Sequence, residues 1–284
     1  MIAYFNGTYL DKGEIRVSPD DRAFLFADSL YEAVRSYRGR LFRLKDHLDR
    51  LGQGAQFLNF RETDFSFLKP VAEELLRKNN LYGRNAVLYF QVSRGSTPKR
   101  THAFPDPGVG LTIYATASAL DTKGLNRDME TGIRVITVPD QRWANCHIKT
   151  TGLLANALAS EQARQAGARE AVFVRDNRVL EGSHSNFFMV VDGSLATAPL
   201  SNRILPGITR KVVLEVCRES DIPVQERAVE KNEMCLATEM FVTATSMQVT
   251  PVVSFDGEMV GRGMPGPVTR KLQALFETVV DRSE

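Results

Sequence analysis

The sequence predicts an α+β protein of two domains, and two patterns support this prediction. Short apolar segments are joined in pairs by tight turns, as at Asn6-Gly7 and Asp192-Gly193, whose residue types suit positive backbone dihedral angles. Apolar residues at helical spacing, as in residues 44–58, lie between these pairs. Hairpins outnumber parallel crossovers, and 284 residues are enough for two domains of modest size.

Residues 1–118 are expected to form an N-terminal α+β domain. Strands are predicted for residues 4–10, 30–44, 85–95 and 109–117, the first two as hairpins, and helices for residues 44–58 and 71–80. Asp46 is predicted to be the N-cap of the first of these helices. The polar residues 119–129 show no apolar period, so they are expected to link the two domains.

Residues 130–284 are expected to form a C-terminal α+β domain. Strands are predicted for residues 132–140, 171–182, 186–199 and 239–253, and helices for residues 153–167, 208–220 and 269–280. Gly167 is expected to end the first helix, and Pro206-Gly207 is expected to lead into the second.

Composition argues against several classes of protein. The 36 basic and 34 acidic residues give a formal charge of +2, unlike a surface built to bind nucleic acid. No apolar run approaches the roughly 20 residues of a membrane span. Three cysteines cannot form a closed disulfide framework, the first residues lack the features of a signal peptide, and no metal-ligand spacing occurs. We therefore expect a soluble cytoplasmic enzyme without a metal, a nucleic-acid partner or a membrane partner.

One glycine-rich motif fails in its context. Residues 261–266 match the dinucleotide-binding pattern G-x-G-x-x-G. Pro265 and Pro267 are expected to obstruct the start of a helix, and the 18 residues that follow are too few for a crossover and a second strand. We therefore predict a turn after a hairpin.

Lys149 occupies an unusual position among the lysines. It follows Ile148 and precedes Thr150-Thr151-Gly152 and a predicted helix start. A lysine at such a junction can lose its hydration, so that its amine becomes neutral and nucleophilic. The ordinary alternative is a lysine that extends its ammonium group from a strand end into solvent.

Two further features gain meaning beside this lysine. Glu181 ends an apolar strand and precedes a polar turn, so its carboxylate can be half-buried, although an exposed hairpin glutamate is the ordinary alternative. Residues 205–209 open a helix whose free N–H groups can bind a phosphate, although ordinary capping explains them equally. Residues 243–246 add hydroxyls, which are also common on exposed strands. An amine, an acid for a ring nitrogen and a phosphate cradle are what pyridoxal phosphate requires.

Four segments resemble, in the same order, the class IV (fold type IV) pyridoxal-phosphate aminotransferases. They are RWANCHIK up to Lys149, LEGSHSN with Glu181, ILPGITR at residues 204–210, and FVTATSMQVTP at residues 241–251. DDRAFLFADSLYEAVR and LKDHLDRL are similar to the same family, so the resemblance covers nearly the whole chain. It implies a two-domain α+β homodimer that binds pyridoxal 5'-phosphate at the domain interface.

The resemblance also implies roles for individual residues. Lys149 would be the Schiff-base lysine, and Glu181 would be the partner of the pyridinium nitrogen. The phosphate would be held by Arg50, Ile208, Thr209 and Thr245, and Leu205 would pack against the ring. Without the resemblance, Arg50 would be explained by a pair with Asp46 four residues earlier.

The chain departs from the family pattern at three positions. Gly152 stands where many relatives carry Asn, His184 where Ser is common, and Ala244 where a hydroxyl is frequent. Gly152 is expected to loosen the helix after Lys149, and the other two put single polar contacts to the cofactor in doubt.

The loop that follows the predicted strand at residues 85–95 contains residues that indicate the substrate. Arg100 and His102 resemble the Arg-x-His pair of D-amino acid transaminases, which the neighbouring subunit supplies in that subfamily. With a tyrosine, here Tyr31, that pair holds the α-carboxylate of the substrate. A guanidinium binds a carboxylate through two hydrogen bonds, and phenol and imidazole groups add donors. From the residues alone, a solvated basic loop is an equal alternative.

The resemblance thus implies a D-amino acid transaminase. It would transfer the amino group of a D-amino acid such as D-alanine to a 2-oxo acid such as 2-oxoglutarate by a ping-pong mechanism. A branched-chain L-amino acid transaminase, with the same cofactor residues, is the first alternative, and an aminodeoxychorismate lyase is the second. A binding protein that has lost its chemistry is disfavoured, because Lys149, Glu181, Arg50 and Thr209 are all present.

Overall fold

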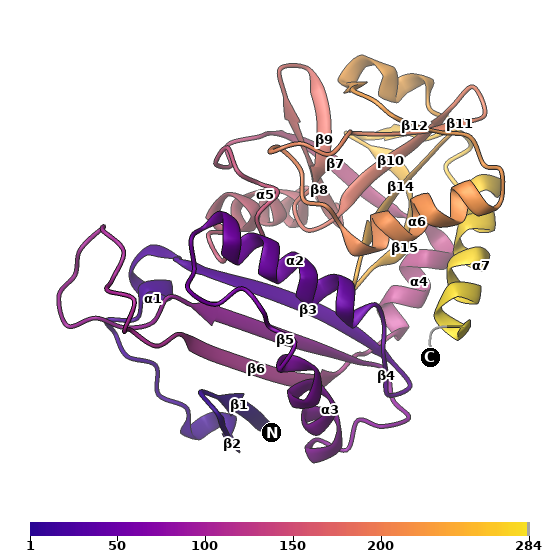
Figure 1. The fold of residues 1–284 in the computed structure, drawn as a ribbon. Helices are drawn as coiled ribbons and strands as arrows, with labels where there is room; N and C mark the ends of the chain where they lie inside the picture. The colour runs from indigo at the N-terminus through magenta and orange to yellow at the C-terminus, as the bar shows by residue number, and fades with distance from the viewer. Residues whose placement is uncertain (283–284) are drawn as a thin grey trace. The chain divides into compact units, whose positions relative to one another are not determined.

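The computed structural model describes residues 1–282 and contains two compact units (Figure 1). The first unit comprises Met1–Leu120 and Ile148–Leu153, and the second comprises Asp121–His147 and Leu154–Arg282. Each unit combines α-helices with a β-sheet, so the predicted α+β class is confirmed. Residues 283–284, which the predicted C-terminal domain includes, lie outside the described residues.

The first unit is built on an antiparallel sheet. Within the described residues, its six strands are β1 (Ile2–Phe5), β2 (Thr8–Asp11), β3 (Ser29–Tyr37), β4 (Arg40–Leu41), β5 (Ala86–Ser93) and β6 (Thr112–Ala119), in the spatial order β2-β1-β6-β5-β3-β4. The 3-10 helix η1 (Lys12–Glu14) and the short helix α1 (Arg22–Phe26) follow β2. The predicted turns at Asn6-Gly7 and Arg38-Gly39 are confirmed, and all four residues have positive φ.

Helices α2 (Leu44–Phe57) and α3 (Leu68–Lys78) pack on one face of this sheet, where their apolar residues form its core with β3, β5 and β6 (Figure 1). The prediction that Asp46 is the N-cap of α2 was wrong. The N-cap is Arg43, which has a left-handed conformation and no side-chain capping bond, and Asp46 lies in the first turn. The helix starts early because Leu44 is drawn into the core.

The second unit contains a mixed sheet. Among the described residues, its ten strands are β7 (Ile133–Pro139), β8 (Glu170–Arg175), β9 (Arg178–Gly182), β10 (Asn186–Val191), β11 (Ser194–Thr197), β12 (Val224–Glu226), β13 (Val229–Glu230), β14 (Glu239–Ala244), β15 (Gln248–Phe255) and β16 (Glu258–Met259). Their order is β12-β11-β10-β14-β15-β7-β8-β9-β13, with β16 on β15. A further pairing of Glu181 with Asn186 joins β9 to β10 and closes six of these strands into a ring.

Helices surround this ring of strands. They are α4 (Lys123–Thr131), α5 (Leu154–Gln165), α6 (Ile208–Glu219), the 3-10 helix η2 (Lys231–Leu236) and α7 (Pro267–Arg282). Helix α5 packs on β7 and β8, while α6 and α7 pack on each other and on β14 (Figure 1). Apolar side chains such as Phe187, Met189 and Val242 form a core cluster between the strands.

Two sequence expectations for this unit were wrong. Helix α4 occupies polar residues that were expected to be irregular, and it buries a single side chain, Leu125, which is too little for an apolar period. Helix α7 begins at Pro267, which was expected to obstruct a helix. A proline fits the first helical position, because its missing N–H has no partner to lose there. The predicted turn after a hairpin is confirmed, since residues 261–264 follow the β15–β16 pair.

None of the helices in residues 1–282 is long and apolar enough to cross a membrane. Cys146, Cys217 and Cys235 are free thiols. In the same part of the chain, no group of three or more His, Cys, Asp or Glu side chains is arranged to hold a metal ion.

Candidate active site

Lys149 belongs to the first unit and lies beside β3. The predicted strand at Ile148 is replaced by an isolated bridge between Thr150 and Leu30, and the Lys149 carbonyl oxygen accepts a hydrogen bond from the Tyr31 N–H at 3.1 Å. The Nζ atom lies 4.1 Å from the centre of the Tyr31 ring. No carboxylate in residues 1–282 pairs with Nζ. The backbone therefore holds an amine that is available for covalent chemistry.

Arg50 lies on α2 in a buried cluster of charges. Its Nε and Nη2 atoms donate to the two carboxylate oxygens of Glu32 at 2.8 and 2.7 Å. Nδ1 of His47 lies 2.7 Å from Oε2 of Glu32. Burial would raise the pKa of Glu32, but the charges and hydrogen bonds of Arg50 and His47 outweigh it and lower this pKa from 4.5 to about 2. An ionised Glu32 thus fixes the direction of the Arg50 guanidinium.

The face of β3 that points away from α2 carries a layer of tyrosines and one arginine. The Tyr31 ring centre lies 5.7 Å from that of Tyr89, and burial raises the pKa of Tyr89 to about 12. Arg35, four residues after Tyr31 on this face, is only 4% exposed, and its Nε and Nη1 atoms have no hydrogen-bond partner among the described residues. Arg35 was not predicted as a site residue. The alternation of side chains along β3 places it on the same face as Tyr31, and this signal could have identified it. An unpaired buried guanidinium is a place for a carboxylate to bind.

Arg100 and His102 lie together on an exposed loop of the first unit. The Arg100 guanidinium lies 4.8 Å from the centre of the Phe26 ring, and the His102 ring lies 5.3 Å from it. Arg22 steadies the loop, because its Nη1 atom donates to the carbonyl oxygens of residues 101 and 103 at 2.8 and 3.1 Å. Within the described chain, no hydrogen bond joins Arg100 or His102 to Tyr31.

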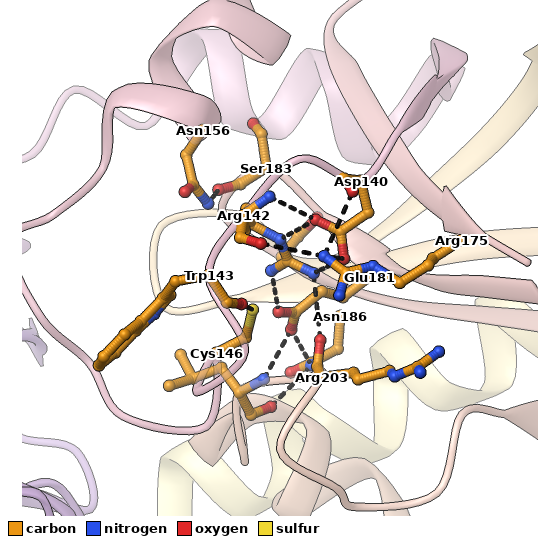
Figure 2. A network of polar contacts seen from close by, with 12 residues as sticks. Asp140, Arg142, Trp143, Cys146, Asn156, Arg175, Glu181, Ser183, Asn186 and Arg203 are labelled. Carbon is orange, nitrogen blue, oxygen red and sulfur yellow. Dashed lines mark hydrogen bonds and ion pairs between the residues drawn. The ribbon is translucent and has the colours of Figure 1, made fainter.

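Glu181 lies in the second unit at the end of β9, and its side chain is buried, so the exposed-hairpin alternative does not apply (Figure 2). Oε1 accepts a hydrogen bond from Nη1 of Arg142 at 2.5 Å. Oε2 accepts hydrogen bonds from Nδ2 of Asn186 at 3.0 Å and from the N–H of Leu205 at 2.9 Å. Glu181 is therefore a buried carboxylate with a fixed plane.

The first turn of α6 has no side-chain cap among the described residues. Gly207 is its N-cap. Ile208 and Thr209 are buried in this turn. The first N–H groups of a helix have no intrahelical partner, so such a turn attracts negative charge.

Asn186 joins this turn to Glu181. Its Nδ2 atom donates to the Leu205 carbonyl oxygen at 2.9 Å as well as to Glu181. A Cβ atom on Gly207 would overlap Oδ1 of Asn186, so the turn can approach this amide only at a glycine. Asn186 ends the segment LEGSHSN but was not predicted as a site residue. No local sequence pattern indicates that its amide joins Glu181 to Leu205.

Thr245 lies half-buried in the turn between β14 and β15. Thr243, two residues earlier, pairs with Asn186 in the register of β14 and β10. Its hydroxyl is buried without a hydrogen-bond partner among the described residues. Buried hydroxyls normally have a partner, so this position is suited to a polar ligand.

The three departures from the family pattern differ in what the structure says of them. His184 lies in a turn that the buried Glu170 holds, because Ser183 and Ser185 donate their hydroxyls to Glu170 at 2.5 and 2.8 Å. Its own Nδ1 atom lies 3.0 Å from Glu170, and its ring is partly exposed. Gly152 precedes α5 and lies outside it, so the expectation that it loosens this helix was wrong. Nothing in the structure explains the alanine at position 244.

The fold is that of a known class of enzymes. Branched-chain amino acid aminotransferase of Escherichia coli superposes with a TM-score of 0.88 at 27% identity, covering 98% of this chain and 93% of that chain. The branched-chain aminotransferase of Thermoproteus uzoniensis, solved with norvaline, superposes with a TM-score of 0.84 at 25% identity, covering 100% and 96%.

Sequence comparison defines the family. The model of the family Amino-transferase class IV matches residues 29–255. The D-alanine aminotransferase of Staphylococcus haemolyticus is 40% identical over 282 residues, which are 98% of this chain and 97% of that protein. The chain belongs to the class IV aminotransferases.

Proposed function

We propose that the protein is a D-amino acid transaminase that uses pyridoxal 5'-phosphate. It transfers the amino group of a D-amino acid such as D-alanine to a 2-oxo acid such as 2-oxoglutarate by a ping-pong mechanism. The observation that carries the proposal is the bridge made by Asn186, which ties a buried acid to an open helix end. The choice of D-amino acids is supported by the similarity to D-alanine aminotransferase.

Each unit, taken by itself, contains groups of the kind that this cofactor requires. The uncapped first turn of α6, with the N–H of Ile208 and the hydroxyl of Thr209, suits a phosphate. Arg50 and Thr245 complete the proposed set of phosphate ligands, and Leu205 packs against the ring. When bound, pyridoxal phosphate supplies an aldehyde that takes up the amino group and a ring that accepts electrons from the substrate.

The chain's own residues orient the reactants and move the proton. Nζ of Lys149 would hold the cofactor, and as a free amine it would take the proton from the substrate Cα and give it back during the reaction. Its freedom from any acid partner in residues 1–282 supports this role. Glu181 would keep a proton on the ring nitrogen, because a carboxylate beside a titratable nitrogen favours the cationic form of that nitrogen.

The proposed substrate site combines two subunits of a cytoplasmic homodimer. Tyr31 comes from one subunit, and Arg100 and His102 come from its neighbour, so that three donors hold the α-carboxylate of the amino acid or oxo acid. The contact of Arg100 and His102 with the same ring, Phe26, supports their action as a pair.

Replacement of the lysine tests the proposal. Lys149→Ala is expected to abolish transamination between D-alanine and 2-oxoglutarate, and borohydride reduction of the wild-type holoenzyme is expected to label Lys149 in a peptide map. Lys45→Ala is the matched control, because Lys45 is exposed and pairs with Asp49 across a helical turn. Substantial activity of Lys149→Ala, or a label on another lysine, would contradict the proposal.

A branched-chain L-amino acid transaminase is the second candidate, favoured by the solved structures that superpose on this chain. Single half-reactions separate the two. D-alanine is expected to discharge the absorbance of the aldehyde form of the cofactor, and L-leucine is expected to leave it nearly unchanged. The opposite preference would establish the second candidate.

A further inference from the structure

Glu181 is the end of a buried chain of alternating charges in the second unit (Figure 2). Arg142 binds Glu181 through Nη1 and binds Asp140 through its other edge, with Nε 2.9 Å from Oδ1 and Nη2 3.3 Å from Oδ2. The side chains of Asp140, Arg142 and Glu181 are 0%, 6% and 6% exposed. We name these three residues the acid–arginine–acid triad.

Several contacts hold the guanidinium group of Arg142. Besides its two acids, Nη2 donates to the carbonyl oxygen of Arg203 at 3.1 Å, and the guanidinium lies 4.2 Å from the centre of the Phe173 ring. Burial alone would lower the pKa of Arg142, but the hydrogen bond that it donates to Asp140 and the charge of Glu181 outweigh burial and raise this pKa above its usual range. Arg142 therefore stays protonated and holds Oε1 of Glu181 in one place.

Asp140 changes the charge that Glu181 presents. An arginine that faced Glu181 alone would cancel its charge, and the neutral pair would attract a cationic ring nitrogen only weakly. With Asp140 on the opposite edge, the triad has a net charge of −1. Arg175 also reaches Asp140, at 3.2 Å, but its side chain is 25% exposed, so solvent screens its charge more than that of the buried Arg142.

We propose that Arg142 and Asp140 are positioning residues for the ring nitrogen of the cofactor. Arg142 orients the Glu181 carboxylate, and Asp140 offsets the arginine charge, so that Glu181 can hold a protonated heterocycle. This inference rests on the proposed function, since it assigns Glu181 to that nitrogen.

A purely structural role explains these charges less well. Taking three charged groups out of water costs free energy, and apolar side chains of similar size often hold a buried segment equally well. The two oxygens of Glu181 are also divided between different donors, with Asn186 and Leu205 on Oε2 and Arg142 on Oε1. Such an arrangement fixes the plane of the Glu181 carboxylate.

The test uses holoenzyme reconstituted with pyridoxal phosphate that carries nitrogen-15 in its ring. Asp140→Asn removes one charge with little change of shape. We expect the pKa of the ring nitrogen, read from its nitrogen-15 shift against pH, to fall by about one unit. The dissociation constant of the cofactor is expected to rise about tenfold.

A matched control exists in the same unit. Asp128 receives a hydrogen bond from Nε of Arg169 at 2.9 Å, as Asp140 does from Arg142. Asp128→Asn removes a paired aspartate charge outside the triad, and it is expected to leave both the nitrogen titration and the dissociation constant unchanged within twofold. A control with the same shift as Asp140→Asn would overturn the inference, because a general change of charge would then explain it.

The melting temperature of the apoprotein separates structure from positioning. An Asp140→Asn variant that melts earlier but keeps the wild-type nitrogen titration and cofactor affinity would overturn the inference. If Asp140→Asn does not fold, Arg142→Lys is measured instead, because it keeps the charge but lacks the planar fork of donors that holds both carboxylates in fixed directions. That variant is expected to bind the cofactor severalfold more weakly with the ring nitrogen still protonated, and an unchanged affinity would overturn the inference.

The wild type distinguishes failure of the inference from failure of the proposed function. A wild-type holoenzyme with an unprotonated ring nitrogen would overturn the role of Glu181 and this inference together. A protonated wild type with unaffected variants would overturn the positioning role alone.

Discussion

Helices α6 and α7 begin after the same Pro-Gly pair, yet their N-termini are satisfied in different ways. The pair is residues 206–207 before α6 and residues 265–266 before α7. At α7, the buried Glu239 accepts hydrogen bonds from the N–H groups of Val268 and Thr269 at 2.9 and 2.8 Å. At α6, no side chain in the described residues takes this place. One helix end contains its own anion, and the other remains available to an external one.

The two glycines show how this difference arises. A Cβ atom on Gly266 would overlap the Glu239 carboxyl group, and one on Gly207 would overlap the Asn186 amide. Each glycine thus admits a side chain from the adjacent strands β14 and β10. At α7 this side chain is the carboxylate of Glu239, which offsets the positive end of the helix dipole. At α6 it is the amide of Asn186, which already donates a hydrogen bond to Glu181. A Pro-Gly pair alone therefore does not identify a phosphate site.

The largest difference is expected from alanine at the two glycines. Gly207→Ala should weaken pyridoxal phosphate binding about 100-fold, because Asn186 must move and release Glu181 and the Leu205 carbonyl. Gly266→Ala should instead lower the melting temperature, since it displaces the Glu239 cap. Cofactor fluorescence titration and thermal unfolding measure both. Equal losses of affinity in the two variants would contradict the contrast.

Removal of the α7 cap is expected to affect stability alone. Glu239→Gln leaves the N–H groups of the first turn without their charged acceptor, so the free energy of unfolding should fall by about 1–3 kcal/mol. The measurement is urea unfolding of the apoprotein. At temperatures where the variant is folded, cofactor affinity should equal that of the wild type, and a tenfold loss of affinity would show that the two helix ends are not independent.

Thr209 in the first turn of α6 and Thr269 in the first turn of α7 form a matched pair, for which we expect smaller effects. Thr209→Val should raise the cofactor dissociation constant about tenfold, because one hydrogen bond from a hydroxyl to the phosphate is lost, with little change in the unfolding free energy. Thr269→Val should do the reverse, since the Thr269 hydroxyl donates to Glu239 at 2.7 Å within the protein. Isothermal titration and urea unfolding on each variant decide the matter. A Thr209→Val protein with wild-type affinity would remove that hydroxyl from the phosphate site.

Arg50 provides the last test, which has its effect in acid. Arg50 pairs with a carboxylate of the protein itself, Glu32, as the start of α7 pairs with Glu239. The pKa of Glu32 is lowered to about 2. A carboxyl group with a lowered folded-state pKa stabilises the fold above its ordinary pKa of 4.5, and this contribution is lost as the pH falls toward 2. Burial also lowers the pKa of His47, so its protonation in acid opposes folding in the same direction. Unfolding free energy should therefore decline from pH 5 to pH 3 more steeply in the wild type than in Glu32→Gln, and parallel curves would contradict this assignment.

Local signals in the sequence were sufficient for much of the fold. Helices α3, α5, α6 and α7 follow their apolar spacing, and the turns at residues 6–7, 38–39 and 192–193 follow their residue types. Helix α4 was not predicted, because it is polar and its helical state depends on contact with β15 rather than on an apolar face of its own. The closure of the strand ring was also not predicted, since it depends on pairing across the whole second unit.

The same distinction applies to the candidate site. Lys149, Glu181 and Thr209 could be selected from their neighbours in sequence, and the family resemblance assigned their roles. The partners that orient them come from distant segments: Glu32 lies 18 residues before Arg50, and Arg142 lies 39 residues before Glu181. No local pattern shows such contacts, because they exist only after the strands have been placed beside one another.

The strand ring of the second unit closes at Glu181, which is proposed to bind the ring nitrogen of the cofactor, and at its hydrogen-bond partner Asn186. Between β9 and β10, the join consists of the registered pair Glu181–Asn186 and the bond from the Gly182 N–H to the Ser185 carbonyl oxygen at 2.7 Å. Because this join is so short, we expect the ring to open here with the lowest free energy, without unfolding of the other strands. A ligand bound to Glu181 would stabilise this join, and the amides on either side of it would then exchange their hydrogens with solvent more slowly than in the empty protein.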